Sequence, residues 1–204
     1  MAGSGALGLL AVQGSYDAHR RAFEALGCTP RPVRRAAQLE GLERIVLPGG
    51  ESTVLSHFLE QEGFGERLAE RLRAATLAAL GTCAGAILLG RAPRDAQAAS
   101  PGGPREPQRL GLAPVTVRRN AYGRQRDSFR APVALAPEIA GPDSRPFEAI
   151  FIRAPRFEAL GAGVQVLGRL GDEPVLVRSG RLVLCAFHPE LTDDLRIHRW
   201  FLGL

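Results

Sequence analysis

The chain has 204 residues, of which 45% are hydrophobic, and carries a formal net charge of +5. This length is that of one ordinary domain, so we expect a single domain over residues 1–204. No apolar run approaches the roughly 18 to 20 residues that cross a bilayer, so no membrane span is expected. All 26 basic residues are arginines, spread along the chain without a basic run or interleaved aromatic residues, so nucleic-acid binding is not predicted.

Strands and helices alternate in the first half of the chain. Apolar runs, several of them closed by glycine or proline, predict strands at 6–14, 30–35, 44–50 and 76–82. Apolar residues at helical spacing and cap signals predict helices at 17–27, 52–63, 66–75 and 84–90. Gly27 is a candidate C-cap of the first helix, and Ser52 or Thr53 a candidate N-cap of the second. His19 and His57 are expected on the solvated faces of these two helices.

The second half is rich in strands. Residues 91–109 contain many Pro, Gly and charged residues, which predicts a loop. Strands are then predicted at 113–119, 129–135, 147–155, 164–170, 174–178 and 181–187, before a final helix at 194–202 that holds His198. The fold class that follows is α/β: a three-layer sandwich with a mainly parallel central sheet flanked by helices and an antiparallel elaboration.

Cys83 stands in the motif GTCAG (81–85), between a predicted strand and a predicted helix. Small residues on both sides are what a nucleophile elbow requires, because the strand-to-helix turn crowds its neighbours. The start of a helix also favours the thiolate. A buried structural cysteine is the other interpretation of these residues alone. The chain has two further cysteines and no CxxC pair, so we expect reduced thiols, a cytoplasmic protein and no metal site.

His188 and Glu190 follow the predicted strand 181–187 in the motif AFHPEL. Side chains two residues apart on an extended segment point to the same side, so Glu190 can orient His188, and His188 can deprotonate Cys83. Parallel strands end at one edge of a sheet, where ligands bind. We therefore predict a catalytic triad of Cys83, His188 and Glu190.

The motif PGGES (48–52) follows another predicted strand. Acyl transfer to a cysteine needs N–H donors aimed at the tetrahedral oxyanion, and glycine allows close approach of the backbone. The N–H groups of Gly50 and Ala84 are the candidate oxyanion hole. A simple turn with a helix cap is the alternative.

These motifs resemble a known family. GTCAG with HPE is similar to the class I glutamine amidotransferases, which have a cysteine nucleophile. The order LAVQGS, LPGGEST, GTCAG, RNAYGRQ, FIRAP and FHPELT is more narrowly similar to the glutaminase subunits of pyridoxal 5′-phosphate synthases, over nearly the whole chain. The long segment 91–109 and Tyr122, where phenylalanine is common, depart from the pattern, but neither belongs to the triad.

The resemblance implies a glutaminase fold, L-glutamine as substrate, and a glutamyl thioester on Cys83. Carried over by motif, the substrate contacts are Gly50, Glu51, Ser52, Arg119, Ile152 and Arg153. The resemblance also implies a synthase subunit that receives the ammonia and whose docking gates activity. The chain has no lysine for imine chemistry, so that chemistry would belong to the partner, and no cofactor is expected on this chain.

Two other functions remain open at this point. A cysteine hydrolase or peptidase on a related α/β scaffold also needs an elbow cysteine near a histidine. A catalytically silent regulatory subunit of a synthase would share the fold without the activity.

Overall fold

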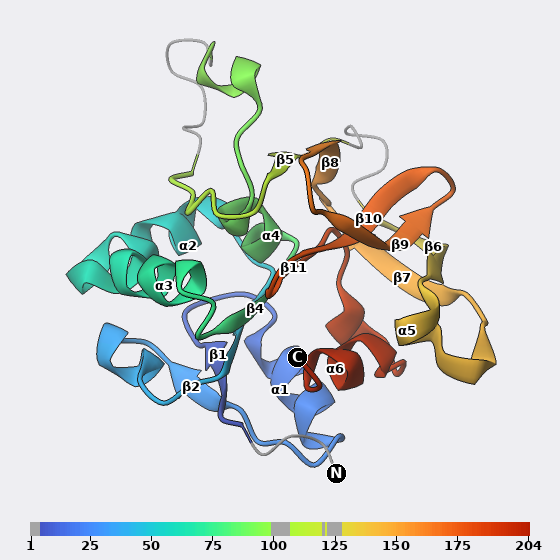
Figure 1. Cartoon of the computed structure of the whole chain (residues 1–204), viewed down its shortest axis with the longest axis horizontal. Coiled ribbons are helices and arrows are strands. Elements are labelled where there is room, and N and C mark those ends of the chain that lie inside the picture. Colours follow the sequence, from blue (N-terminus) through green and yellow to red (C-terminus); the bar gives the residue numbers. More distant parts are fainter. Residues whose placement is uncertain (1–4, 99–106, 120, 122–127) are drawn as a thin grey trace.

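The computed structural model describes residues 5–98, 107–119, 121 and 128–204. Its strands form a nine-stranded sheet in the order β2-β1-β3-β4-β11-β10-β9-β6-β7 (Figure 1). The parallel half consists of β2 (Arg31–Val33), β1 (Leu7–Leu10), β3 (Arg44–Leu47), β4 (Ala78–Thr82) and β11 (Leu182–Cys185). The antiparallel half consists of β10 (Glu173–Ser179), β9 (Gln165–Leu170), β6 (Ser128–Leu135) and β7 (Phe147–Ile152). A separate pair is formed by β5 (Val115–Arg118) and β8 (Arg156–Leu160).

The parallel strands are buried on both faces. Every residue of β1, β3, β4 and β11 is buried, which explains their continuous apolar runs, whereas β7 alternates between buried and more exposed residues. In the parallel register Leu47 pairs with Gly81, and Thr82 pairs with Cys185. The carboxyl ends of β3, β4 and β11 therefore lie level, and the loops that follow them meet at one edge of the sheet.

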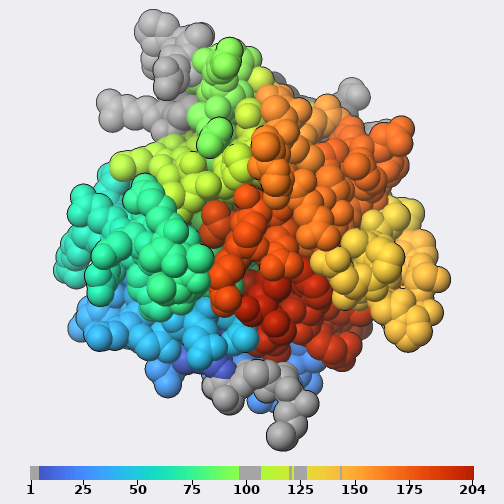
Figure 2. All heavy atoms as spheres, in the orientation of Figure 1, coloured from blue at the N-terminus to red at the C-terminus, as the bar shows by residue number. Residues whose placement is uncertain are grey.

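Helices cover both faces of the parallel half (Figure 1). On one side α1 (Tyr16–Glu24) packs against α6 (Arg196–Phe201); on the other lie α2 (Ser52–Leu59), α3 (Phe64–Arg73) and α4 (Ala84–Leu89). Figure 2 shows the short α5 (Pro137–Ala140, yellow) beside α6 (red). This arrangement confirms the predicted three-layer α/β fold. Among the described residues, no helix combines the length and apolar character needed to span a bilayer.

Several element boundaries differ from the prediction. The strand β8 and the helix α5 were not expected, and the predicted strand 6–14 ends at Leu10. The predicted loop 91–109 contains a short 3₁₀ helix, η3, and its residues 99–106 lie outside the described part of the chain. Among the described residues the 3₁₀ helices are η1 (Ala36–Leu39), η2 (Gln61–Gly63), η3 (Arg94–Ala98), η5 (Gly141–Asp143) and η6 (Pro189–Leu191).

The helix caps give one confirmed and one wrong prediction. Gly27 has φ 77° and follows α1, where the N–H groups of Gly27 and Cys28 donate to the carbonyls of Glu24 and Phe23, as in a Schellman motif. The N-cap of α2 is Glu51, not Ser52 or Thr53. Its carboxylate accepts hydrogen bonds from the amides of Thr53 and Val54, at 3.3 and 3.2 Å, because the side chain of Glu51 folds over the first turn of the helix that follows it.

Candidate active site

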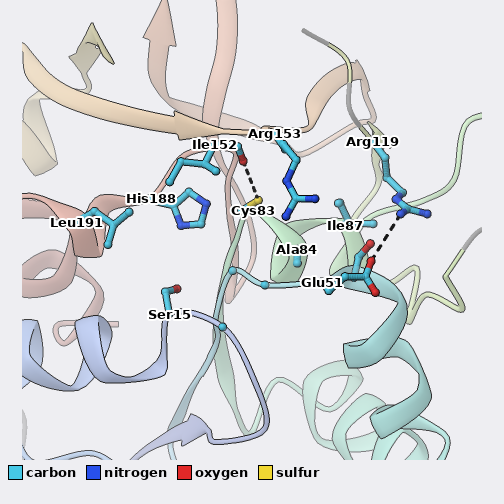
Figure 3. Close-up of a pocket in the computed structure, with 14 residues that line it drawn as sticks. Ser15, Glu51, Cys83, Ala84, Ile87, Arg119, Ile152, Arg153, His188 and Leu191 are labelled. Carbon is cyan, nitrogen blue, oxygen red and sulfur yellow. Dashed lines mark hydrogen bonds and ion pairs between the residues drawn. The ribbon is translucent and has the colours of Figure 1, made fainter. Parts of the chain in front are cut away.

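A cavity of about 260 Å³ opens where β3, β4 and β11 end (Figure 3). It is smaller than the roughly 300–1,000 Å³ typical of sites for drug-sized ligands, and so suits a small metabolite. Residues from segments far apart in sequence line it: Gly14, Ser15, Gly49, Gly50, Glu51, Ser52, Cys83, Ala84, Ile87, Arg119, Ile152, Arg153, His188 and Leu191. All the residues predicted for the triad, oxyanion hole and substrate contacts are in this set except Glu190, which lies behind His188.

Cys83 occupies a strained turn between β4 and α4. Its backbone has φ 48° and ψ −102°, a conformation that costs a non-glycine residue about 1–3 kcal/mol. A Cβ on Gly81 would lie 2.6 Å from the backbone of Gly85, and a Cβ on Gly85 would lie 2.0 Å from the carbonyl oxygen of Leu47. The turn can therefore form only with glycine on both sides of the cysteine, which is the reason the sequence motif suggested.

The Cys83 side chain is 7% exposed and faces the cavity. Its thiol donates to the carbonyl oxygen of Ile152, with 3.7 Å between the sulfur and the oxygen (Figure 3). The backbone N–H of Cys83 donates to the Cys185 carbonyl at 2.8 Å, which attaches the turn to β11. The nucleophile candidate is thus held by one contact to β7 and one to the neighbouring strand β11.

His188 and Glu190 form a buried pair at the end of β11. The Nδ1 atom of His188 lies 2.7 Å from Oε1 of Glu190, and the residues are 7% and 6% exposed. The contact agrees with the prediction, but the predicted extended segment is wrong. The chain turns into η6 at Pro189, whose fixed φ suits the first position of a helical turn, and Glu190 is thereby brought back to the imidazole.

The electrostatics of this pair favour its charged form. Burial alone would lower the pKa of His188, but hydrogen bonds with Cys83 and Glu190 and the charge of Glu190 raise that pKa above its ordinary value. Burial alone would raise the pKa of Glu190, but neighbouring His19 and the hydrogen bond from His188 lower it. The site is therefore suited to hold an imidazolium beside a carboxylate.

Gly49 lies close to both His188 and Cys83. A Cβ on Gly49 would lie 2.4 Å from Cε1 of His188 and 3.4 Å from Cβ of Cys83. Its N–H donates to Oγ1 of Thr82 at 3.0 Å, and its carbonyl accepts from the Ser15 N–H at 3.1 Å. The C=O and N–H of a trans peptide point in opposite directions, so the N–H of Gly50 points away from Ser15.

Charged side chains of both signs stand at the cavity. Nη2 of Arg119 lies 4.0 Å from Oε1 of Glu51, the carboxylate that also caps α2 (Figure 3). Arg153 follows β7 and has φ 42°, so it shares with Cys83 a positive φ that is unusual outside glycine. Strained residues of this kind are concentrated at functional sites. Of the motif RNAYGRQ, residues 120 and 122–125 lie outside the described part of the chain.

Comparison with known proteins shows the family of this chain. Residues 9–203 match the SNO glutamine amidotransferase family. This chain belongs to that family. Proteins named pyridoxal 5′-phosphate synthase subunit PdxT are similar over almost their whole length: one from Thermus thermophilus is 46% identical, covering 98% of this chain and 97% of that protein, and the one from Deinococcus radiodurans is 48% identical, covering 97% and 96%.

Solved structures are similar to this glutamine amidotransferase over nearly its whole length. A structure described as a crystal structure of glutamine amidotransferase superposes with a TM-score of 0.84 at 42% identity and covers 97% of both chains. PurLQS from Thermotoga maritima gives a TM-score of 0.69 at 13% identity, covering 98% of each chain, which supports the fold alone.

The structure adds residues that the sequence interpretation missed in this glutamine amidotransferase. His19 and His198 were expected on solvated faces or without a role, but both are fully buried, and His19 lies 3.3 Å from Oε2 of Glu190. One signal was available: the fully buried Phe23 follows His19 by four residues, which places both on one helix face. Ser15 and Leu191 also line the cavity, and each lies in or beside a motif that the resemblance used. In the part of the chain that the structure describes, no group of three or more His, Cys, Asp or Glu residues is placed to bind a metal ion.

Proposed function

We propose that this chain is the glutaminase of a pyridoxal 5′-phosphate synthase: it hydrolyses L-glutamine to glutamate and ammonia and supplies the ammonia to a synthase subunit. The observation that carries the proposal is the elbow cysteine beside the His188–Glu190 pair, in a chain of the glutamine amidotransferase family. Relatives named as a subunit of that synthase match nearly all of its length.

The charges around the cavity suit an amino acid. A guanidinium binds a carboxylate strongly, so Arg119 and Arg153 would hold the α-carboxylate of glutamine. Glu51 would attract the α-ammonium group. Gly50, Ser52 and Ile152 would complete the contacts and direct the side-chain amide toward Cys83.

In the first half of the reaction, the Cys83 proton passes to Nε2 of His188, and the thiolate attacks the amide carbon of glutamine. The carbonyl oxygen becomes an oxyanion, which the N–H groups of Gly50 and Ala84 would stabilise. When the tetrahedral intermediate collapses, the C–N bond breaks and the imidazolium gives its proton to the departing nitrogen. Ammonia leaves, and the glutamyl group remains on the sulfur as a thioester.

In the second half, neutral His188 takes a proton from a water molecule, which attacks the thioester carbon. The C–S bond breaks, glutamate leaves, and the proton on His188 returns to Cys83. Through both steps Glu190 keeps the Nδ1–H of His188 pointed toward itself, so that Nε2 faces the sulfur and the substrate.

The ammonia would then be used elsewhere. The chain contains no lysine, so it offers no side-chain amine for imine chemistry with a sugar phosphate. A docked synthase subunit would receive ammonia before it is protonated or lost to solvent, and its docking would complete the oxyanion hole, a gating step of a common type. The three cysteines are free, which suits a reducing compartment such as the cytoplasm.

Glutamate formation from L-glutamine, measured with and without the synthase subunit, tests this function. We expect turnover that rises with the subunit, disappears in Cys83→Ala, and persists in Cys28→Ala, because Cys28 lies outside the cavity. No glutamate even with a competent synthase would favour the silent regulatory subunit. Cleavage of peptide bonds in place of glutamine would favour the peptidase.

A further inference from the structure

Three polar side chains lie fully buried behind the triad and have no part in the proposed mechanism. They are Thr82 at the end of β4, His19 in α1 and His198 in α6, each 0% exposed. Burying polar groups costs free energy unless they are paired, so a cluster of three needs an explanation. His19 contacts the oxygen of Glu190 that His188 does not, and Thr82 and His198 both contact His19.

The contacts in this cluster are short. Nε2 of His19 lies 3.1 Å from Oγ1 of Thr82 and 3.3 Å from Oε2 of Glu190, the carboxylate oxygen that His188 does not use. Nδ1 of His19 lies 3.1 Å from Nε2 of His198. Oε2 accepts no well-aligned hydrogen bond within the described residues, so its 3.3 Å approach to Nε2 of His19 is a close polar contact on that side of the carboxylate.

The surroundings of His198 at one end of the cluster and of Glu190 at the other determine which ring nitrogens of the two histidines carry protons. Nδ1 of His198 has no hydrogen-bond partner among the described residues, and an unpaired buried acceptor is more readily tolerated than an unpaired buried N–H. We therefore assign the His198 proton to Nε2, which donates to Nδ1 of His19. The proton of His19 then sits on Nε2, from which the N–H points toward Oγ1 of Thr82 and lies close to Oε2 of Glu190, 3.3 Å from Nε2. If the His19 proton were on Nδ1 instead, the lone pair of its Nε2 would face the lone pairs of Oε2 of Glu190, which is unfavourable.

The other titratable groups around Glu190 are consistent with this assignment. Burial lowers the pKa of His19 and, to about 3, that of His198, so both are neutral donors at physiological pH. Burial raises the pKa of the Cys185 thiol, which therefore stays protonated. His188 and the Ser15 hydroxyl face the carboxylate from the side of the cavity, and Cys83 lies beyond His188.

Thr82 connects this cluster to the segment 48–52, called here the oxyanion loop because it holds the proposed oxyanion donor Gly50. Its hydroxyl oxygen accepts the N–H of Gly49 at 3.0 Å while contacting His19 on its other side. One hydroxyl therefore joins the group that holds Glu190 to the peptide beside the proposed oxyanion donor Gly50.

We propose that His19 is a positioning residue for the catalytic pair: its Nε2–H holds the second oxygen of Glu190, and through Thr82 it fixes the Gly49 end of the oxyanion loop. This inference rests on the proposed function, because it assigns His19 to the triad of that reaction. His198 sets the proton position of His19 from behind.

Two variants separate this role from simple packing. The amide nitrogen of Gln in His19→Gln can occupy the place of Nε2, whereas the shorter side chain in His19→Asn reaches only the place of Nδ1. Both are neutral and polar, so they differ mainly in the contact with Glu190. Without that contact the buried carboxylate binds a proton at higher pH, and it then stabilises neither the imidazolium nor the paired thiolate.

The experiment is the pH dependence of Cys83 alkylation by iodoacetamide, followed by peptide mass spectrometry on the full chain, together with glutamate formation by its complex with the synthase subunit. We expect His19→Asn to move the acid limb of both profiles upward by about one pH unit with little change in KM. His19→Gln should stay close to the wild type, and His57→Asn, an exposed control on α2, should leave both unchanged.

Equal acid limbs in the wild type, His19→Asn and His19→Gln would overturn the proposal, even if melting temperatures fell. Equal shifts in both variants would overturn it as well, since only one of them loses the Nε2 contact. The alkylation needs neither glutamine nor synthase. A wild type that alkylates at Cys83 but forms no glutamate would therefore contradict the proposed function, while the His19 comparison could still be read.

Discussion

The substitution Gly49→Ala tests the geometry of the proposed catalytic pair, His188 and Glu190, with a single methyl group. The new Cβ would lie 2.4 Å from Cε1 of His188, whereas ordinary contacts begin near 3.4 Å, so the ring must retreat by the difference of 1.0 Å. His188 has little freedom to move, because its Nδ1 is held 2.7 Å from Glu190. Gly49 does not have a left-handed backbone, so alanine brings no backbone strain of its own.

A displacement of about 1 Å at a reacting group costs about 100-fold in rate, or about 2.7 kcal/mol in activation free energy. We therefore expect kcat for glutamate formation by the synthase complex to fall about 100-fold in Gly49→Ala. The unfolding midpoint in urea should change little. The matched control is Gly203→Ala, whose Cβ would meet only the Trp200 carbonyl oxygen at 3.3 Å, and whose kcat should equal that of the wild type.

Wild-type kcat in a folded Gly49→Ala protein would refute this reasoning. It would mean either that His188 does not act from this position or that the loop lies farther from the ring during turnover. A large loss of stability with normal activity per folded molecule would contradict it equally. That result would mean that the clash destabilises the folded chain without displacing His188.

Three other changes test separate parts of the account. Gly85→Ala places a Cβ 2.0 Å from the Leu47 carbonyl oxygen, and we expect a loss of at least about 3 kcal/mol in the free energy of unfolding; an unchanged urea midpoint would contradict this. Arg119→Ala should raise KM for glutamine about 10-fold or more with a smaller effect on kcat, while Arg118→Ala, whose guanidinium pairs with two carboxylates elsewhere, should not. The hydrogen bond from His188 and the charge of that imidazolium hold the folded pKa of Glu190 below its ordinary 4.5, so its stabilisation is present above 4.5 and is lost as pH falls through the folded pKa; the melting temperature of Glu190→Gln should fall less steeply over that range, and parallel curves would count against the charged pair.

The architecture could be predicted because its main signals are local. A strand buried on both faces must be apolar at every position, so β3, β4 and β11 were visible as runs. The elbow at Cys83 was visible for a related reason, since glycine is required where backbones approach within van der Waals contact. The convergence of three strand ends then followed from the topology of parallel sheets.

The missed features depend on contacts between distant residues. His19 was expected on a solvated helix face, yet it is buried against His198, 179 residues later in the chain. No periodicity reveals such a partner. The N-cap of α2 was assigned to residues with short polar side chains, but the carboxylate of Glu51 is already in place one residue earlier.

The pairing of His188 with Glu190 was predicted for a reason that the structure does not support. Alternation along a strand would place both side chains on one side, but the chain leaves the strand and turns at Pro189. The same motif permits both geometries. The carboxylate could therefore be identified from the sequence, whereas its second partner, His19, could be found only in the folded chain.

The most direct test of the central claim is to trap the acyl-enzyme. The complex with the synthase subunit is mixed with L-glutamine, quenched with acid during turnover, digested and analysed by mass spectrometry. We predict one glutamyl group in thioester linkage on the peptide that contains Cys83, and none in His188→Ala, which lacks the base. Steady glutamate formation with no adduct on that peptide, or with the adduct on another residue, would contradict the account.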